Sequence, residues 1–142
     1  MDMDEPNPLI RRAREVALRA YAPYSNFRVG AVVTDSRGAV YVGCNVESGS
    51  YGLSMCAERS AIFAAVASGA PRPFTALAVS GLDAPGGATP CGACRQVIFE
   101  HLAADAPIHV DGIGQFTLNE LLPFAFDLKA GATIGRSSGV EG

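Results

Sequence analysis

Three cysteines and a glutamate are the residues of this sequence best suited to chemistry. They fall in two short stretches, Ser54–Ala61 (SMCAERSA) and Thr89–Gln96 (TPCGACRQ). Cys91 and Cys94 have the Cys-x-x-Cys spacing that zinc sites use at the start of a helix, and Cys56 opens a second helical pattern. We therefore expect both stretches to converge on one zinc ion held by Cys56, Cys91 and Cys94.

A site with three thiolate ligands would leave the fourth zinc position open to water, as in catalytic rather than structural sites. Glu58 lies two residues after Cys56, close enough to exchange protons with that water as a general acid and base. Three thiolates give the site excess negative charge. The positive helix N-termini and Arg59, which could donate to the sulfurs, would offset that charge and keep the metal acidic.

The two motifs together resemble the small zinc-dependent cytidine deaminases of nucleoside salvage, and the resemblance extends from about Tyr24 to Phe126. It implies an α/β/α fold, one Zn²⁺ per subunit and a homotetramer with shared active sites. It also implies hydrolysis of cytidine and 2′-deoxycytidine to uridine and 2′-deoxyuridine plus ammonia, in pyrimidine salvage. Glu58 would then move protons from water to N3 and to the departing amino group while water attacks C4.

The resemblance also implies residues that bind the nucleoside. Asn45 and Glu47 match an Asn-x-Glu pair that holds the ribose hydroxyls, which an amide and a carboxylate can do. Phe27 matches an aromatic that packs on the pyrimidine. Phe126 matches an aromatic near the end of the chain, often supplied by a neighbouring subunit, and Tyr51 would border such a shared site.

The loop after Glu47 departs from the family pattern. It reads Ser-Gly-Ser-Tyr at residues 48–51, where the family usually has Asn-Ala-Ser-Tyr. Gly49 would contact the edge of the base mainly through its backbone. The greater freedom of glycine leaves the exact substrate open.

Three other functions stay open from the residues. A related zinc deaminase for a nucleoside analogue or a free base is favoured if Asn45 and Glu47 prove unimportant. A dithiol oxidoreductase would use Cys91 and Cys94 but leaves the Cys-Ala-Glu-Arg motif unexplained. A zinc-stapled interaction module would need Cys44 as a fourth ligand, although its place in an apolar strand favours a buried, inert thiol.

Several single residues also have simpler structural readings. Glu58 could be a solvated carboxylate that the helix dipole favours, and Arg59 a surface charge. Phe27 and Phe126 could be core aromatics. Asn45 could be a turn residue at the end of a strand.

Composition narrows the class of protein. The chain has 142 residues, of which 49% are hydrophobic and 18% charged, so we expect one folded domain over residues 1–142, with loose tails at 1–7 and about 130–142. A net charge of −3 argues against nucleic-acid binding. The chain has no apolar run long enough to span a membrane and no signal-peptide pattern at its acidic start. We therefore expect a cytoplasmic protein whose partner is a small molecule, and with only two histidines a His-based metal site is not expected.

The periodicity of apolar residues predicts the elements that position these groups. Helices are expected over 8–20, about 54–68 and 91–103, with a helix-like segment at 117–123. The middle helix is apolar almost all round, which predicts burial on every side. Strands are expected over 27–34, 40–46, 74–82 and 108–112, with a possible fifth near Phe116. This order predicts a three-layer α/β/α sandwich with a mixed sheet of about five strands.

Overall fold

The computed structural model describes residues 7–129, which form a five-stranded sheet with helices on both faces. Of the two predicted tails, only Asn7 lies within this part of the chain, and its side chain caps the first helix by accepting a hydrogen bond from Leu9 N at 2.7 Å. The elements follow in the order α1 (Pro8–Ala17), β1 (Val29–Thr34), β2 (Val40–Cys44), η1 (Tyr51–Leu53), α2 (Ala57–Ala67), β3 (Ala76–Gly81), α3 (Gly92–His101), β4 (Ile108–Val110), β5 (Gly114–Phe116) and α4 (Leu118–Leu121).

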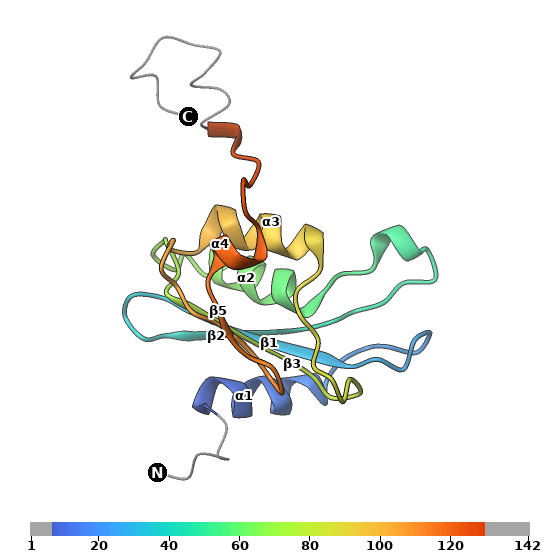
Figure 1. The fold of residues 1–142 in the computed structure, drawn as a ribbon. Helices are drawn as coiled ribbons and strands as arrows, with labels where there is room; N and C mark the ends of the chain where they lie inside the picture. The colour runs from blue at the N-terminus through green and yellow to red at the C-terminus, as the bar shows by residue number, and fades with distance from the viewer. Residues whose placement is uncertain (1–6, 130–142) are drawn as a thin grey trace.

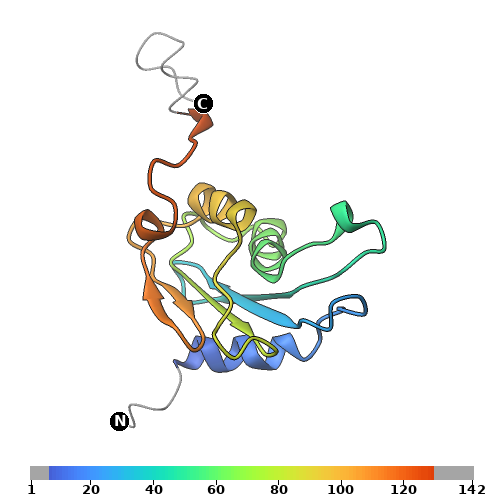
Figure 2. The ribbon, with the colours of Figure 1, turned by 45° about the vertical axis from the view of Figure 1, so that its right-hand side comes forward.

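The sheet is mixed, with the strand order β2-β1-β3-β4-β5. Only the β3–β4 pair is parallel, and α3 makes the crossover between these two strands. Helix α1 covers one face of the sheet, and α2 and α3 cover the other (Figure 1, Figure 2). This arrangement confirms the three-layer α/β/α sandwich and the mixed sheet expected from the sequence.

Two glycines let the helices lie close to the sheet. A Cβ atom at Gly30 in β1 would come within 2.1 Å of the Ala13 carbonyl oxygen in α1. A Cβ atom at Gly43 in β2 would lie 2.3 Å from Ala61 N and 2.8 Å from the Ala57 carbonyl oxygen, both in α2. Because Ala57 follows Cys56 directly, the close approach at Gly43 sets where the first cysteine motif sits.

The main hydrophobic core lies between the sheet and the layer of α2 and α3. Burial of these side chains, at roughly 25 cal/mol per Å² of apolar surface, supplies the main force that holds the cysteine-bearing helices in place. Its largest fully buried members include Ile62 of α2, Leu77 of β3, Ile98 of α3, Ile108 of β4 and Phe74.

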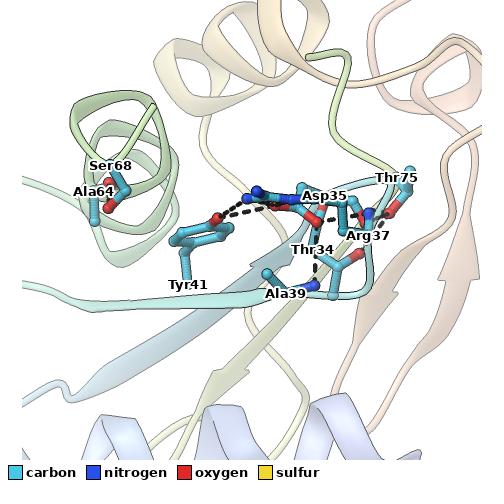
Figure 3. Close-up of polar contacts among 8 residues, drawn as sticks. All are labelled: Thr34, Asp35, Arg37, Ala39, Tyr41, Ala64, Ser68 and Thr75. Carbon is cyan, nitrogen blue, oxygen red and sulfur yellow. Dashed lines mark hydrogen bonds and ion pairs between the residues drawn. The ribbon is translucent and has the colours of Figure 1, made fainter. Parts of the chain in front are cut away.

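The hairpin between β1 and β2 is closed by a buried carboxylate (Figure 3). Asp35, whose side chain has no exposed surface, accepts hydrogen bonds from the backbone N–H groups of Arg37 and Ala39 at 2.8 and 3.1 Å. It also accepts from the Arg37 guanidinium at 2.8 Å and from the Tyr41 hydroxyl at 2.9 Å. These charge-assisted bonds hold the pKa of Asp35 well below its usual range, so the carboxylate stays ionised.

Helix α2 differs in two ways from the sequence-based expectation. It begins at Ala57 rather than near residue 54, because Met55 is extended and exchanges backbone hydrogen bonds with Val46. It is also not buried on every side, since Phe63 and Val66 are 43% and 41% exposed in the single chain. An apolar pattern marks side chains that avoid water, but it does not say whether this chain or another covers them.

None of the helices in residues 7–129 has the length and apolar character needed to cross a membrane.

Candidate active site

The sulfur atoms of Cys56, Cys91 and Cys94 form one compact triangle. The Sγ atoms of Cys56 and Cys91 are 3.9 Å apart, those of Cys91 and Cys94 are 3.5 Å apart, and all three lie within 4.8 Å of one another. Two sulfurs about 2.3 Å from a tetrahedral zinc ion are separated by about 3.8 Å. The two measured separations bracket this value, so the triangle has the size of a zinc site.

The ends of two helices bring these sulfurs together. Cys56 is the N-cap of α2 and Cys91 is the N-cap of α3, each with an extended backbone, while Cys94 lies in the first turn of α3. Neither N-cap side chain is used to cap its helix, which leaves both sulfurs free to face the metal site. Both positive helix ends thus point at the thiolates, as the sequence predicts, and stabilise their charge.

Arg59 adds a full positive charge beside this cluster. Its Nη2 donates to Cys56 Sγ at 3.4 Å, and its Nε is buried without a hydrogen-bond partner among the described residues. Hydrogen bonds from the Cys94 thiol and from Arg59 lower the pKa of Cys56, whereas sharing a proton with Cys56 and burial raise the pKa of Cys94. The surroundings of Cys56 thus favour the thiolate, which is the form of cysteine that binds a metal.

Glu58 is a buried carboxyl group beside the sulfurs. It lies at the second position of α2 and only 5% of its surface is exposed. Burial raises the pKa of Glu58 to about 7, and the negative charge of the Cys56 thiolate adds to the rise. A carboxyl group with this pKa can both take up and release a proton near neutral pH, which is what a general acid and base must do.

Asn45 fixes the backbone at the end of β2. Its Nδ2 donates to the Phe27 carbonyl oxygen at 2.7 Å, and its Oδ1 accepts from Val29 N at 2.9 Å. The structural reading of Asn45 as a residue that secures the end of a strand thus describes what it does within this chain. A carboxamide has two donors and two acceptor lone pairs, so one of each is left for another partner.

Glu47 is held by the turn that follows α1. Its carboxylate accepts from the backbone N–H groups of Tyr24 and Ser25 at 3.0 and 3.1 Å and from the Ser25 hydroxyl. These bonds, led by the one from the Ser25 hydroxyl, lower the pKa of Glu47, so it is a carboxylate at neutral pH. An open cleft of about 240 Å³ lies against it, lined by Tyr24, Ser25, Glu47, Ser48, Tyr51 and Ser54.

The three predicted aromatic residues are all exposed to different degrees in the single chain. The Phe27 ring is 37% exposed and lies beside Gly81, at the start of the loop that leads to Cys91. Tyr51 is 79% exposed on the η1 segment, which projects away from the sheet (Figure 2). Phe126 is 64% exposed on the segment after α4, so the reading of Phe126 as a core aromatic is wrong for the described chain.

Gly49 lies against the hydroxyl group of Tyr24. A Cβ atom at this position would be 3.0 Å from Tyr24 Oη, a contact that requires the exposed tyrosine to shift slightly. The glycine that departs from the family pattern thus makes room for Tyr24 at the edge of the Glu47 cleft.

The site does not include the fourth cysteine. Cys44 points its thiol at the Arg19 carbonyl oxygen, 3.7 Å away, and is not part of the sulfur triangle. This placement weighs against a closed four-cysteine zinc site. The third sulfur, from Cys56, likewise favours a metal over a simple Cys91–Cys94 dithiol.

Two residues of the second motif, Arg95 and Gln96, have contacts that the sequence reasoning missed. Arg95 donates to the carbonyl oxygens of Pro90 and Leu121, and Gln96 donates to that of Phe126. Their position directly after Cys94 could have singled them out. Their partners could not be predicted, because a backbone carbonyl is the same at every position of the sequence.

Comparisons with known proteins agree with this geometry. Residues 3–109 match the family model described as the cytidine and deoxycytidylate deaminase zinc-binding region. A cytidine deaminase from Sporosarcina psychrophila is 42% identical over 130 residues, which cover 89% of this chain and 92% of that protein.

Solved structures of cytidine deaminases are also similar to this chain. The crystal structure of cytidine deaminase from Burkholderia pseudomallei has a TM-score of 0.76 and 44% identity, with 83% of this chain and 96% of that chain covered. For cytidine deaminase from Mycobacterium tuberculosis the TM-score is 0.73 and the identity 40%, with 84% and 94% covered. On these matches, and on the sulfur triangle that both motifs build, the chain belongs to the zinc-dependent cytidine and deoxycytidylate deaminase family.

Proposed function

We propose that the protein hydrolyses cytidine and 2′-deoxycytidine to uridine and 2′-deoxyuridine, with release of ammonia. The observation that carries the proposal is the zinc-sized triangle of sulfurs with the buried Glu58 carboxyl beside it. The similarity to proteins named cytidine deaminase supports the choice of substrate.

In the proposed reaction, Cys56, Cys91 and Cys94 would hold a zinc ion, which when bound would act as a Lewis acid and make water a better nucleophile. Glu58 would accept a proton from the attacking water and deliver it to N3 of the pyrimidine as the new C4–O bond forms. Glu58 would then take the remaining proton from that oxygen and pass it to the amino group, which leaves as ammonia when the C4–N bond breaks. Its burial suits this role, because a carboxyl group with a pKa of about 7 can return the protons that it accepts.

The proposed nucleoside site uses groups that retain hydrogen-bonding capacity. Asn45 has one donor and one acceptor left, and the Glu47 carboxylate has acceptor sites beyond its three bonds. In the proposal Glu47 meets a ribose hydroxyl from the open cleft that it lines, and Asn45, which follows β2 directly, meets the other. Phe27 would pack on the pyrimidine, and the backbone of Gly49 would meet its edge.

We further propose a homotetramer in which the subunits share active sites. The support is that Tyr51 and Phe126 both lie exposed on projecting segments, and that α2 exposes Phe63 and Val66. Light scattering on the purified protein would test this assembly. A tetramer of the 14.7 kDa chain has a mass of about 59 kDa (4 × 14.7), whereas a monomeric mass with full activity would contradict shared sites. A cytoplasmic role in pyrimidine salvage stays a prediction from the sequence.

The direct test combines metal analysis with substrate turnover. Purified protein is analysed for zinc and mixed separately with cytidine, 2′-deoxycytidine and free cytosine, and the loss of cytidine absorbance and the release of ammonia are followed. We expect about one zinc per chain and turnover of both nucleosides but not of the free base. Turnover of cytosine alone would favour the free-base deaminase, and zinc-free protein that cycles Cys91 and Cys94 with thiols would favour the oxidoreductase.

A further inference from the structure

Arg95 connects the metal-binding loop to α4, near the end of the described chain. It follows Cys94 in the first turn of α3 and is half-buried. Its Nε donates to the carbonyl oxygen of Pro90 at 2.7 Å, and its Nη1 donates to the carbonyl oxygen of Leu121 at 2.8 Å. One guanidinium thus bridges two backbone segments that are 31 residues apart in the sequence (121 − 90).

The Pro90 carbonyl belongs to the peptide bond that leads into Cys91. Because a peptide unit is planar, fixing this oxygen also fixes the direction in which the Cys91 Cα leaves the bond. Pro90 itself is fully buried, but it ends a long loop that contains Gly86 and Gly87. Cys91 is exposed and does not cap its helix with its side chain, so it depends on its backbone for orientation.

Leu121, which accepts the other hydrogen bond of Arg95, lies in a well-fixed part of the structure. Leu121 ends α4 and is buried in the core together with Leu118. The start of α4 is fixed by a capping box, in which Thr117 and Glu120 exchange side-chain and backbone hydrogen bonds. A charged donor also makes a stronger hydrogen bond to a carbonyl than a neutral one does.

We propose that Arg95 is a positioning residue that holds Cys91 in place for zinc by bracing the Pro90 carbonyl against the end of α4. The inference rests on the proposed function, since it concerns the same metal site. Arg95 touches neither metal nor substrate, and it acts only through the backbone that carries Cys91. Zinc retention in this protein therefore depends on α4, an element that contributes no ligand.

Gln96 provides a matched comparison on the same helix. Its Nε2 donates to the carbonyl oxygen of Phe126 at 2.7 Å, so it reaches the same C-terminal part of the chain. No hydrogen bond joins it to the Pro90–Cys91 backbone within residues 7–129. Gln96→Ala therefore loosens the segment after α4 without freeing Cys91.

The test measures how fast zinc leaves the folded protein. Zinc-loaded full-length wild type, Arg95→Met, Arg95→Lys, Gln96→Ala and Asp35→Asn are mixed with excess of a chromogenic chelator, well below their unfolding temperatures. Loss of an outer partner of a metal ligand typically weakens metal binding by about 10- to 100-fold. We expect release from Arg95→Met to be faster by about that factor, and that from Arg95→Lys to be intermediate. Gln96→Ala and Asp35→Asn should release zinc at the wild-type rate.

A second measurement separates positioning from general stability. Because zinc binds the folded state, it raises Tm, and this increase shrinks when zinc binding weakens. The increase should be smaller in Arg95→Met than in wild type, but unchanged in Asp35→Asn, which loses the hairpin network far from the metal site. Wild-type zinc release and an unchanged zinc-dependent Tm increase in Arg95→Met would overturn the role of Arg95. If Arg95→Met does not fold, the same comparison is made with Arg95→Lys. A wild-type chain that takes up no zinc would instead overturn the proposed function itself.

Discussion

At the scale of single residues, the proposed chemistry depends on Glu58, a carboxyl group that can be either protonated or ionised near neutral pH. Glu58 is buried beside Cys56, and burial, with a smaller contribution from the negative charge of the Cys56 thiolate, raises its pKa to about 7. A solvated carboxylate at a helix start would be fully ionised at pH 7 and a poor proton donor. Its environment therefore sets Glu58 apart from Asp35, the carboxylate of the β1–β2 hairpin, whose pKa is lowered.

The Glu58→Gln variant separates proton transfer from metal binding. The amide keeps the size of the side chain but cannot accept or return a proton, so we expect kcat to fall by about 10²- to 10⁴-fold. Zinc content and Tm should stay close to wild type, because Glu58 is not a proposed ligand. Steady-state kinetics with cytidine, together with metal analysis of the same sample, make the measurement. Activity near the wild-type level would remove Glu58 from the mechanism.

The three proposed metal ligands could be predicted from the sequence, but the hydrogen bonds that hold the surrounding backbone could not. Cys56, Cys91 and Cys94 could be found because zinc needs a particular spacing and residue type. The bonds of Asn45 and Arg95 could not, because a backbone carbonyl is an equally good acceptor at any position in the chain. Whether a side chain reaches it depends on the three-dimensional path of the backbone.

At the scale of elements, the close contact of strand β2 with helix α2 positions the first motif. Gly43→Ala would force a Cβ atom to within 2.3 Å of Ala61 N, so α2 must move away from the sheet. Overpacking of this kind costs about 1–3 kcal/mol in the free energy of unfolding. Because Cys56 caps the same helix, we also expect slower turnover and weaker zinc binding, measured per folded molecule.

Gly30→Ala is the matched control for this substitution. It crowds α1 on the opposite face of the sheet, where a Cβ atom would lie 2.1 Å from the Ala13 carbonyl oxygen. Its loss of stability should be similar, with zinc binding and kcat unchanged. Equal losses of zinc affinity in both variants would mean that the β2–α2 contact has no special part in positioning Cys56.

The hairpin network around Asp35 predicts a pH dependence of stability. Bonds from Arg37 and Tyr41 lower the pKa of Asp35 in the folded state, so its stabilisation is complete above the unfolded carboxyl pKa of about 4. That stabilisation is lost as the pH falls below this value. The Tm difference between zinc-free wild type and Asp35→Asn should therefore be several degrees at pH 7, begin to shrink below about pH 5, and keep shrinking as the pH falls toward the low folded-state pKa of Asp35. A difference that stays constant over this range would show that the Asp35 charge is not what stabilises the hairpin.

The periodicity of apolar residues predicted every strand and the three long helices of the described chain, because each element buries one face or both. It failed at the start of α2, where the Met55–Val46 bridge extends the backbone before the helix begins. No local pattern marks such a bridge, since its two partners are separated by a loop. The exposure of Phe63 and Val66 on α2 was missed because an apolar pattern in the sequence does not say whether the rest of the chain covers those side chains.

At the scale of the whole molecule, the sheet and its helix layer bring two distant cysteine motifs to one point. Arg95 also joins the second motif to α4 by its hydrogen bonds to the carbonyl oxygens of Pro90 and Leu121. The geometry of the metal site therefore depends on α4 as well as on the helices that carry the cysteines. The projecting segments with Tyr51 and Phe126 extend beyond this core (Figure 1). In the proposed tetramer they would complete the sites of neighbouring subunits.

Zinc K-edge X-ray absorption of the zinc-loaded protein tests the central claim most directly. The measurement reports which atoms surround the metal and how far away they lie. Coordination by Cys56, Cys91 and Cys94 with a water predicts three sulfur scatterers at about 2.3 Å and one oxygen at about 2.0 Å. A shell of four sulfurs, or one with fewer than three, would contradict the three-thiolate hydrolytic site.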